Sequence, residues 1–250
     1  MPHLRQHILE TRSGSAISVH EGGGGSVPVF AIGGIAVRPF IESGMGPALE
    51  DAVDHGARCA LMDIAGSGAS ASSPALSMDA WIADIEEVFA ARVREPAVWT
   101  GSSIGAWLML RVHVRHPEWF RAMCALAPAF DWDQTYVGPR LADGRLGVID
   151  GTVVNPDATA LATRELLVSM AAHHVLPEPA SLVAPLHVIF GGRDEMAPAA
   201  ATKRFIEMAR GAQCTGELLP EADHGVAKLD PRQVLLRYQA WLRAQLGAHP

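Results

Sequence analysis

The strongest constraint on this fold is a G-x-S-x-G pattern at Gly101-Ser102-Ser103-Ile104-Gly105, which lies between two segments of different periodicity. Residues 96–99 before the pattern form an apolar run that favours a buried strand, and residues 104–116 repeat apolar side chains at helical spacing. Such a pattern is typical of a sharp strand-to-helix turn whose serine has a strained backbone. We therefore expect Ser103 at a strand end, beside a helix N-terminus whose free N–H groups point toward it.

Strands and helices are expected to alternate on both sides of this turn. Buried strands are predicted at 27–32, 57–64, 96–99, 122–127, 186–190 and 216–219, and helices at 45–55, 78–94, 104–116, 198–209 and 231–246. Two further strands at 7–11 and 16–20 precede them. On the helix at 78–94, Asp84 is expected on the side opposite the apolar face. The alternation predicts an α/β fold with a mostly parallel central sheet and helices on both faces.

Residues 131–184 interrupt the alternation, because they contain no clear strand of the main sheet. A small hairpin is predicted at 144–151 and a helix with a weakly apolar face at 158–174. An excursion of this length in a compact α/β domain usually has a function. We expect one domain, with a core made of residues 1–130 and 185–250 and a small lid made of residues 131–184.

Composition places the chain among globular proteins and narrows its partners. Its 250 residues, 49% of them apolar and 19% charged, can bury one sizeable core. A net charge of -7 without long basic runs argues against nucleic acid or an anionic membrane as partner. No signal-peptide core or membrane-spanning stretch is visible, and Cys59, Cys124 and Cys214 are odd in number and widely spaced. A cytoplasmic protein is therefore expected.

Chemical partners for Ser103 are expected downstream, after two later strands. Asp194 follows the predicted strand at 186–190, and His224 lies in the loop after the strand at 216–219. The carboxyl ends of parallel strands meet at one sheet edge, where a hydroxyl, a carboxylate and an imidazole could converge. The chain order Ser, Asp, His is one of the known orders of a catalytic triad. The candidates are therefore Ser103 as nucleophile, His224 as general base and Asp194 as the acid that orients it.

Two backbone N–H groups are candidates for stabilising an oxyanion. One belongs to Ile104, which directly follows the serine, and the other is expected in the loop after the strand at 27–32. In that loop Ile35 is the preferred donor, and Gly34 and Ala36 are the alternatives. The glycines there could let the backbone approach the reacting carbon, or could simply form a tight exit from the strand.

Other acidic residues compete for the role of Asp194. Asp131 and Asp133 follow the strand at 122–127 and could supply the acid instead. Glu195 would point away in a tight turn, and Asp223 is expected to cap its own loop.

Other histidines and glycines give weaker signals. His113 and His116 have no cysteine or acid at metal-ligand spacing and are expected at the surface or at a helix end. His173 and His174 are expected at a solvated helix end, with one of them bordering the pocket as the alternative. The turn Gly66-Ser67-Gly68 lacks the third glycine of a dinucleotide fingerprint. Neither a metal nor a cofactor is expected.

Together these motifs resemble those of the α/β-hydrolase superfamily of serine hydrolases along nearly the whole chain. Residues 63–70 are similar to its D-x-x-G-x-G-x-S turn and residues 192–198 to its G-x-D-x-x-x-P acid loop. Residues 101–110, the pair His173-His174 and the triplet Ala222-Asp223-His224 are similar to the mitochondrial palmitoyl-protein thioesterase and acyl-glucuronide esterase branch. Most of the lid and the glycines of the oxyanion loop depart from that branch.

The resemblance implies an α/β-hydrolase fold with a small lid, and hydrolysis of small-molecule carboxylic esters or thioesters through an acyl-enzyme on Ser103. Candidate substrate-binding side chains in the lid are Trp132, Tyr136 and Met170, which could instead simply hold the lid to the core. The same residues could instead serve acyl transfer, perhydrolysis or C–C bond cleavage, or the fold could bind a ligand without catalysis. The sequence does not specify an oligomeric state.

Overall fold

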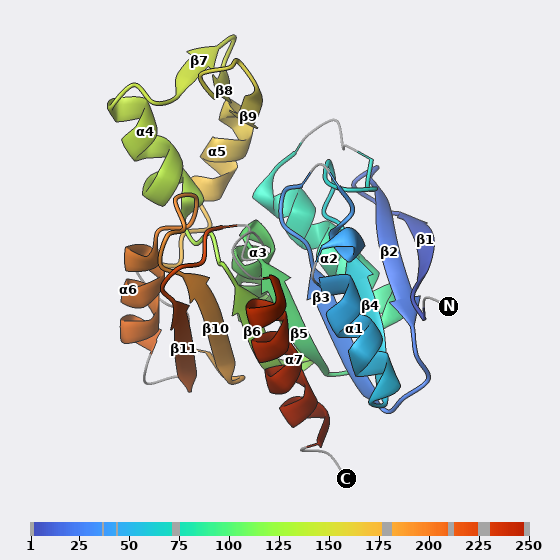
Figure 1. Cartoon of the computed structure of the whole chain (residues 1–250). Coiled ribbons are helices and arrows are strands. Elements are labelled where there is room, and N and C mark those ends of the chain that lie inside the picture. The colour runs from blue at the N-terminus through green and yellow to red at the C-terminus, as the bar shows by residue number, and fades with distance from the viewer. Residues whose placement is uncertain are drawn as a thin grey trace.

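In the computed structural model of the chain, the described residues are 3–36, 38–43, 45–71, 76–176, 182–209, 213–224 and 231–247, with the side chains of 231–235 left out. Eight described strands form one sheet (Figure 1): β1 (Arg5–Glu10), β2 (Ala16–Gly22), β3 (Val27–Ile32), β4 (Ala57–Met62), β5 (Ala97–Ser102), β6 (Phe120–Leu126), β10 (Leu186–Gly191) and β11 (Cys214–Leu219). Their order is β1-β2-β4-β3-β5-β6-β10-β11. Strand β2 is antiparallel to both β1 and β4, and all other neighbours are parallel. The expected mostly parallel sheet is confirmed.

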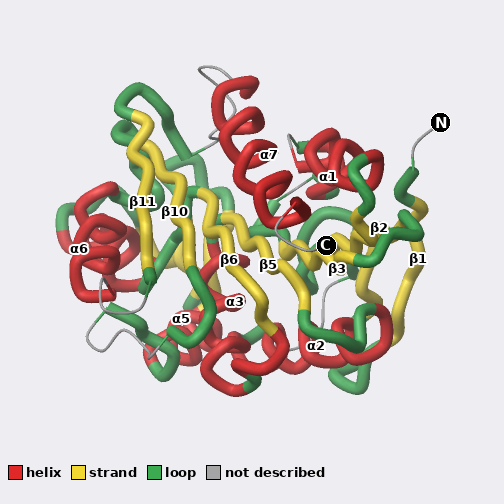
Figure 2. Tube along the Cα trace, turned by 90° about the horizontal axis from the view of Figure 1, so that it is seen from below, coloured by secondary structure: helices red, strands yellow, loops and turns green. Residues whose placement is uncertain are grey.

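Helices cover both faces of the sheet. The longer ones are α1 (Met45–Asp54), α2 (Met78–Arg92), α3 (Ile104–Arg115), α6 (Ala199–Ala209) and α7 (Pro231–Gly247), with 3-10 turns at Phe40–Glu42 and Pro117–Trp119. Figure 2 shows α1 and α7 on one face and α2, α3 and α6 on the other. Each face therefore has its own apolar core. Because both faces are covered, every residue of β3 is buried, which explains its uninterrupted apolar run.

Between β6 and β10 the chain leaves the sheet in an excursion, seen at the top of Figure 1. It contains a π-helical turn (Asp133–Val137), α4 (Gly138–Ala142), β7 (Gly147–Ile149), β8 (Thr152–Val154), β9 (Ala160–Thr163) and α5 (Arg164–Ala171). A hairpin is present as the antiparallel pair β7–β8, but it spans residues 147–154, three residues later than predicted. The helix predicted from residue 158 is wrong at its start, because β9 pairs with β8 and the Thr163 side chain caps α5. Residues 177–181 of the predicted lid lie outside the described residues.

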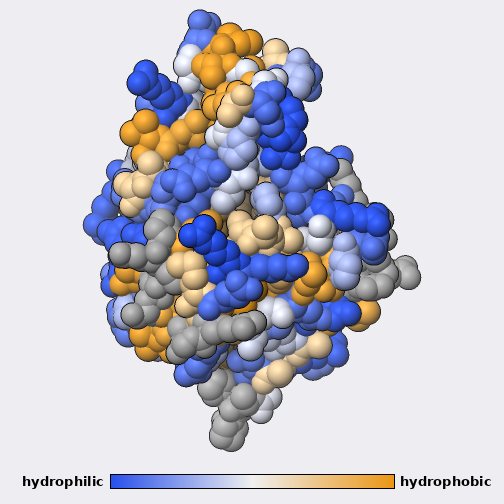
Figure 3. Space-filling view, turned by 90° about the vertical axis from the view of Figure 1, so that its left-hand side faces the viewer, coloured by the Kyte–Doolittle hydropathy of each residue, from blue (hydrophilic) through white to orange (hydrophobic). Residues whose placement is uncertain are grey.

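The outer part of the excursion presents apolar side chains to solvent. Val148 and Ile149 on β7 and Val168 on α5 are exposed. Figure 3 shows apolar atoms gathered at this upper end of the molecule. None of the helices in the described ranges is both long and apolar enough to cross a bilayer.

Asp84 and His113 are polar helix residues whose side chains are buried. Asp84 of α2 is 1% exposed, because Thr11 and Ser13 of the β1–β2 connection donate hydrogen bonds to its Oδ1 at 2.6 and 2.7 Å. His113 of α3 is also buried, packed edge-on against Phe120, and its burial lowers its pKa. The prediction that Asp84 faces away from the apolar core is wrong, because the β1–β2 connection covers this side chain. His113 lies in the last turn of α3, so the helix-end alternative of its prediction is confirmed.

Candidate active site

Ser103 lies in the turn between β5 and α3 with φ of 54° and ψ of -124°. Residues other than glycine rarely adopt a positive φ, so the backbone must be held there by its surroundings. The Ser103 N–H donates to Leu126 O at 2.9 Å, and Ser103 O accepts from Ala106 N and Ala129 N, each at 3.1 Å. The expected strained strand-to-helix turn is present.

Two glycines allow the loop after β3 to pack against this turn. A Cβ atom on Gly105 would lie 2.5 Å from Gly33 O, and a Cβ on Gly34 would lie 2.8 Å from Ser103 Cβ. Neither separation is compatible with a side chain. The absence of both side chains therefore brings the backbone of the β3 loop next to the Ser103 side chain.

Three side chains from three loops meet at the carboxyl end of the sheet. Asp194 follows β10 and His224 follows β11, and both strands run parallel to β5. Ser103 Oγ lies 3.0 Å from His224 Nε2, and His224 Nδ1 lies 2.9 Å from Asp194 Oδ2. The structure thus joins a hydroxyl, an imidazole and a carboxylate by two consecutive hydrogen bonds.

The carboxylate of Asp194 is held by its own loop. Its side chain is 1% exposed, and its Oδ1 accepts hydrogen bonds from Met196 N at 3.0 Å and Ala197 N at 2.7 Å. Oδ2 is left to accept a hydrogen bond from the Nδ1–H of His224, whose side chain is 22% exposed. In that tautomer the Nε2 lone pair faces Ser103 Oγ and can take its proton.

The two expected oxyanion donors lie in the segments that flank Ser103. Ile104 is the first residue of α3, where helix N–H groups lack partners within the helix and the dipole is positive. Ile35 follows Gly34, the residue whose backbone approaches Ser103. This arrangement can stabilise negative charge that develops on an acyl oxygen bonded to Ser103.

Comparison with known proteins identifies the fold. The family model described as serine aminopeptidase, S33, matches residues 45–154. The chain is similar to α/β hydrolase domain-containing protein 10 from mouse, with 16% identity and a TM-score of 0.76 over 96% of this chain and 99% of that one. It is also similar to an esterase from Pyrococcus furiosus, with 18% identity and a TM-score of 0.70 over 96% and 90% of the two chains.

A thioesterase domain from the curacin biosynthetic pathway matches with 14% identity and a TM-score of 0.69 over 96% of this chain and 99% of that one. The chain has the α/β-hydrolase fold. No curated protein matches it significantly in sequence. The α/β-hydrolase fold that the motifs predict is therefore confirmed.

The competing acids have other partners. The Asp131 carboxylate accepts hydrogen bonds from Val175 N at 2.7 Å and Leu176 N at 2.8 Å, and burial raises its pKa. Asp133 binds the His174 imidazole through Nε2 at 2.8 Å. Neither carboxylate therefore serves His224.

Two further acidic residues, Glu195 and Asp223, lie next to members of the triad in the sequence. Glu195 is exposed, as expected for a side chain that points away from Asp194. Asp223 Oδ1 is buried, and no hydrogen bond from the described residues reaches it. The loop cap expected at Asp223 thus has no partner in the part of the chain that the structure covers.

His173 and His174 lie in the turn after α5, and both imidazoles are largely buried. The prediction of a solvated helix end is wrong, because Trp107 of α3 covers this turn and donates its Nε1–H to His173 O at 2.7 Å. His173 Nε2 also lies 3.1 Å from Asp79 Oδ1. Sequence reasoning missed the structural role of this pair, and its similarity to one hydrolase branch was the only available signal.

The three candidate substrate-binding side chains lie where the excursion meets the core of the protein. Trp132 and Met170 are buried, and the ring of Tyr136 stacks on Trp132 with centroids 5.4 Å apart. The Arg140 guanidinium lies 4.0 Å above the Tyr136 ring, in cation–π geometry. Their binding of substrate remains a prediction.

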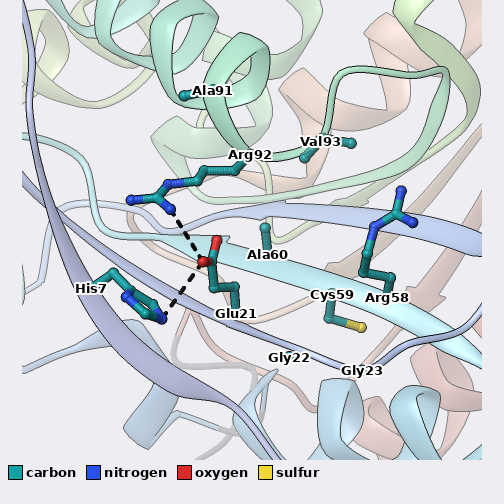
Figure 4. A pocket seen from close by; sticks show the side chains of 10 residues that line it. All are labelled: His7, Glu21, Gly22, Gly23, Arg58, Cys59, Ala60, Ala91, Arg92 and Val93. Atoms are coloured by element: carbon teal, nitrogen blue, oxygen red, sulfur yellow. Dashed lines mark hydrogen bonds and ion pairs between the residues drawn. The ribbon is translucent and has the colours of Figure 1, made fainter.

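A separate cavity of about 360 Å³ lies at the amino-terminal end of β4, away from the strand ends that carry the triad (Figure 4). Glu21 Oε1 faces both Arg92, at 3.3 Å, and His7, at 3.6 Å. Burial raises the pKa of the lining Cys59 thiol to about 12, so it is not a nucleophile. Among the described residues, no group of histidine, cysteine and acidic side chains could hold a metal ion.

Proposed function

We propose that this α/β-hydrolase is a serine hydrolase that cleaves small-molecule carboxylic esters or thioesters through an acyl-enzyme intermediate on Ser103. The observation that carries the proposal is the pair of hydrogen bonds, 3.0 and 2.9 Å long, from Ser103 Oγ through His224 to buried Asp194. The motif resemblance and the similarity in fold to an esterase and a thioesterase domain support this substrate class. Asp194 and His224 then have the roles of orienting acid and general base.

In the acylation step, Ser103 Oγ attacks the acyl carbon while its proton moves to His224 Nε2. Asp194 holds the imidazole in the tautomer with hydrogen on Nδ1 and stabilises the imidazolium that forms. His224 then gives the proton to the leaving group, at oxygen for an ester or at sulfur for a thioester. In the second step water, deprotonated by His224, attacks the acyl-enzyme and releases the acid.

The oxyanion of each tetrahedral intermediate would be stabilised by the backbone N–H groups of Ile104 and Ile35. Each donor of this kind typically contributes about 3 kcal/mol to transition-state stabilisation. Residues 131–184 would act as a lid, with Trp132, Tyr136 and Met170 bounding the acyl group.

A serine-directed fluorophosphonate probe and a substrate panel test this proposal. The panel comprises nitrophenyl esters and acyl-CoA thioesters of graded length, together with aminoacyl nitroanilides, because the matching family model is described as an aminopeptidase. The wild-type protein is expected to be labelled on Ser103 and to hydrolyse esters or thioesters faster than anilides. Preferred cleavage of anilides would overturn the assigned substrate class.

Ser103→Ala is expected to abolish labelling and turnover without lowering the melting temperature, because only the hydroxyl is removed. Ser102→Ala, at the end of β5, is the matched control and should retain both. A folded wild-type protein that is neither labelled nor active would instead be a non-catalytic ligand-binding protein.

A further inference from the structure

The two ends of the excursion meet at a neck, formed by residues 131–135 where it leaves the core and residues 173–176 where it returns. Asp131 binds both sides of this neck. Its carboxylate oxygens accept from Val175 N at 2.7 Å and Leu176 N at 2.8 Å, and its backbone oxygen accepts from Gln134 N at 2.9 Å and Thr135 N at 2.8 Å. Asp131 therefore links the outgoing and the returning segments of the neck directly.

The position of Asp131 is unfavourable in two respects. Its side chain is completely buried, and its backbone φ is 48°, in the left-handed region that residues other than glycine rarely occupy. No lysine or arginine in the described ranges lies within salt-bridge distance of its carboxylate, so backbone N–H groups provide its stabilisation. Strain and burial of this kind persist only where the surrounding structure enforces them, and they often accompany a functional requirement.

The neck is also attached to the helix that begins beside the nucleophile. Trp107, one turn after Ser103, donates its Nε1–H to His173 O and stacks on the ring of His174, with centroids 6.2 Å apart. His174 in turn binds Asp133 on the opposite side of the neck. A displacement of the neck would therefore change the position of the excursion relative to α3.

Two of the three candidate substrate-binding residues are adjacent to the neck. Trp132 directly follows Asp131, Met170 lies one helical turn before His174, and both side chains are buried. The position of the Tyr136 ring depends on the neck as well, because this ring stacks on Trp132. The neck therefore holds the chain segments that carry these side chains, and Trp107 connects it to the helix that begins beside Ser103.

We propose that Asp131 is a positioning residue that determines acyl-chain specificity by closing the neck and holding Trp132 and Met170 in place. The inference rests on the proposed function, and it assigns Asp131 a role different from that of a triad acid. Asp131 acts through the neck and touches neither Ser103 nor His224. Its loss should therefore change which acyl groups are accepted, while the chemistry at Ser103 continues.

Asp131→Asn tests this role, because one oxygen becomes an amide donor that faces a backbone N–H group. The measured quantity is the ratio of kcat/KM for a long-chain and an acetyl nitrophenyl ester. We expect this ratio to change about tenfold, the effect of losing one buried hydrogen bond, mainly through KM of the long-chain ester. The acetyl ester should keep its pH profile and its kcat.

Asp84→Asn is the matched control, because Asp84 is also buried and also accepts two hydrogen bonds, from the β1–β2 connection and not from the neck. It should lower stability and leave the ratio unchanged. Equal ratios in both variants would overturn the proposal. So would loss of acetyl ester turnover with an altered pH profile, which would place Asp131 in the chemistry itself.

Hydrogen exchange of residues 133–176 provides a readout that does not depend on turnover. Asp131→Asn should accelerate exchange there more than Asp84→Asn does, and equal exchange would contradict the closed neck. If Asp131→Asn does not fold, Trp107→Phe is the second variant. It keeps an aromatic ring and removes the hydrogen bond to His173 O, so it should give the same changes at smaller size. If the wild type hydrolyses no substrate, the proposed function fails. Hydrogen exchange then still shows whether Asp131 holds the neck closed.

Discussion

At the residue scale, the candidate site depends on how each carboxylate distributes its two oxygens. Asp194 uses one oxygen for two backbone N–H groups of its own loop and the other for His224. Asp131 uses both oxygens for the returning chain. Only Asp194 thus has an acceptor free for the imidazole, although both residues follow strands of the same sheet.

Asp194→Asn is expected to reduce kcat for the ester on the order of ten-thousand-fold, because an amide in this place favours the wrong imidazole tautomer. Steady-state kinetics at neutral pH measure the effect. The adjacent exposed acid supplies the control, since Glu195→Gln should leave kcat unchanged. A comparable loss in both variants would mean that the loop, and not the carboxylate, is responsible.

The sequence allowed the positions of Ser103, Asp194 and His224 to be predicted because each follows a strand and the carboxyl ends of parallel strands share one edge. It did not allow the partners of Asp84 or Asp131 to be predicted. Those hydrogen bonds join segments 71 or more and 44 or more residues apart, across loops whose path has no periodic signal. Helical periodicity cannot predict side-chain burial that depends on coverage by such distant segments.

At the element scale, boundaries depend on caps and on strand partners. The helix predicted from residue 158 begins six residues later, because Ala160–Thr163 finds a partner in β8 and Thr163 provides the cap. Helix α2 begins in the same way, with the Ser77 side chain accepting a hydrogen bond from Ala80 N at 3.1 Å. Local propensity alone favoured helix in β9, and pairing within the excursion overrode it.

Ser77→Ala should destabilise the fold by about 1 kcal/mol, the usual cost of losing a helix N-cap. For a domain of this size the melting temperature should fall by about 2–4 °C, as measured by thermal unfolding. Ser77→Asn keeps a capping oxygen and should restore most of the loss. Identical losses in both variants would show that the cap is not the cause.

At the scale of the whole molecule, several histidines are buried in ways that oppose their protonation. Burial lowers the pKa of His113, His173 and His187 below the ordinary value of 6.5. In the unfolded chain these imidazoles regain that value. Below pH 6.5 the unfolded state therefore binds more protons than the folded state, and stability decreases as the pH falls.

The urea midpoint of unfolding should accordingly be constant between about pH 7.5 and 8 and fall steadily toward about pH 5.5. Each buried histidine contributes up to about 1.4 kcal/mol per pH unit over this range. His113→Gln should reduce the slope by the share of one histidine. An unchanged slope would show that His113 is protonated in the folded state without penalty.

The closed neck has a consequence for how such a chain can diversify. Because hydrogen bonds join Asp131 directly to Val175 and Leu176, the excursion leaves and rejoins the core at almost the same point. Its length and internal folding are then independent of the spacing between β6 and β10. The intervening segment can be shortened, enlarged or exchanged as a module, while the sheet that presents the nucleophile stays intact.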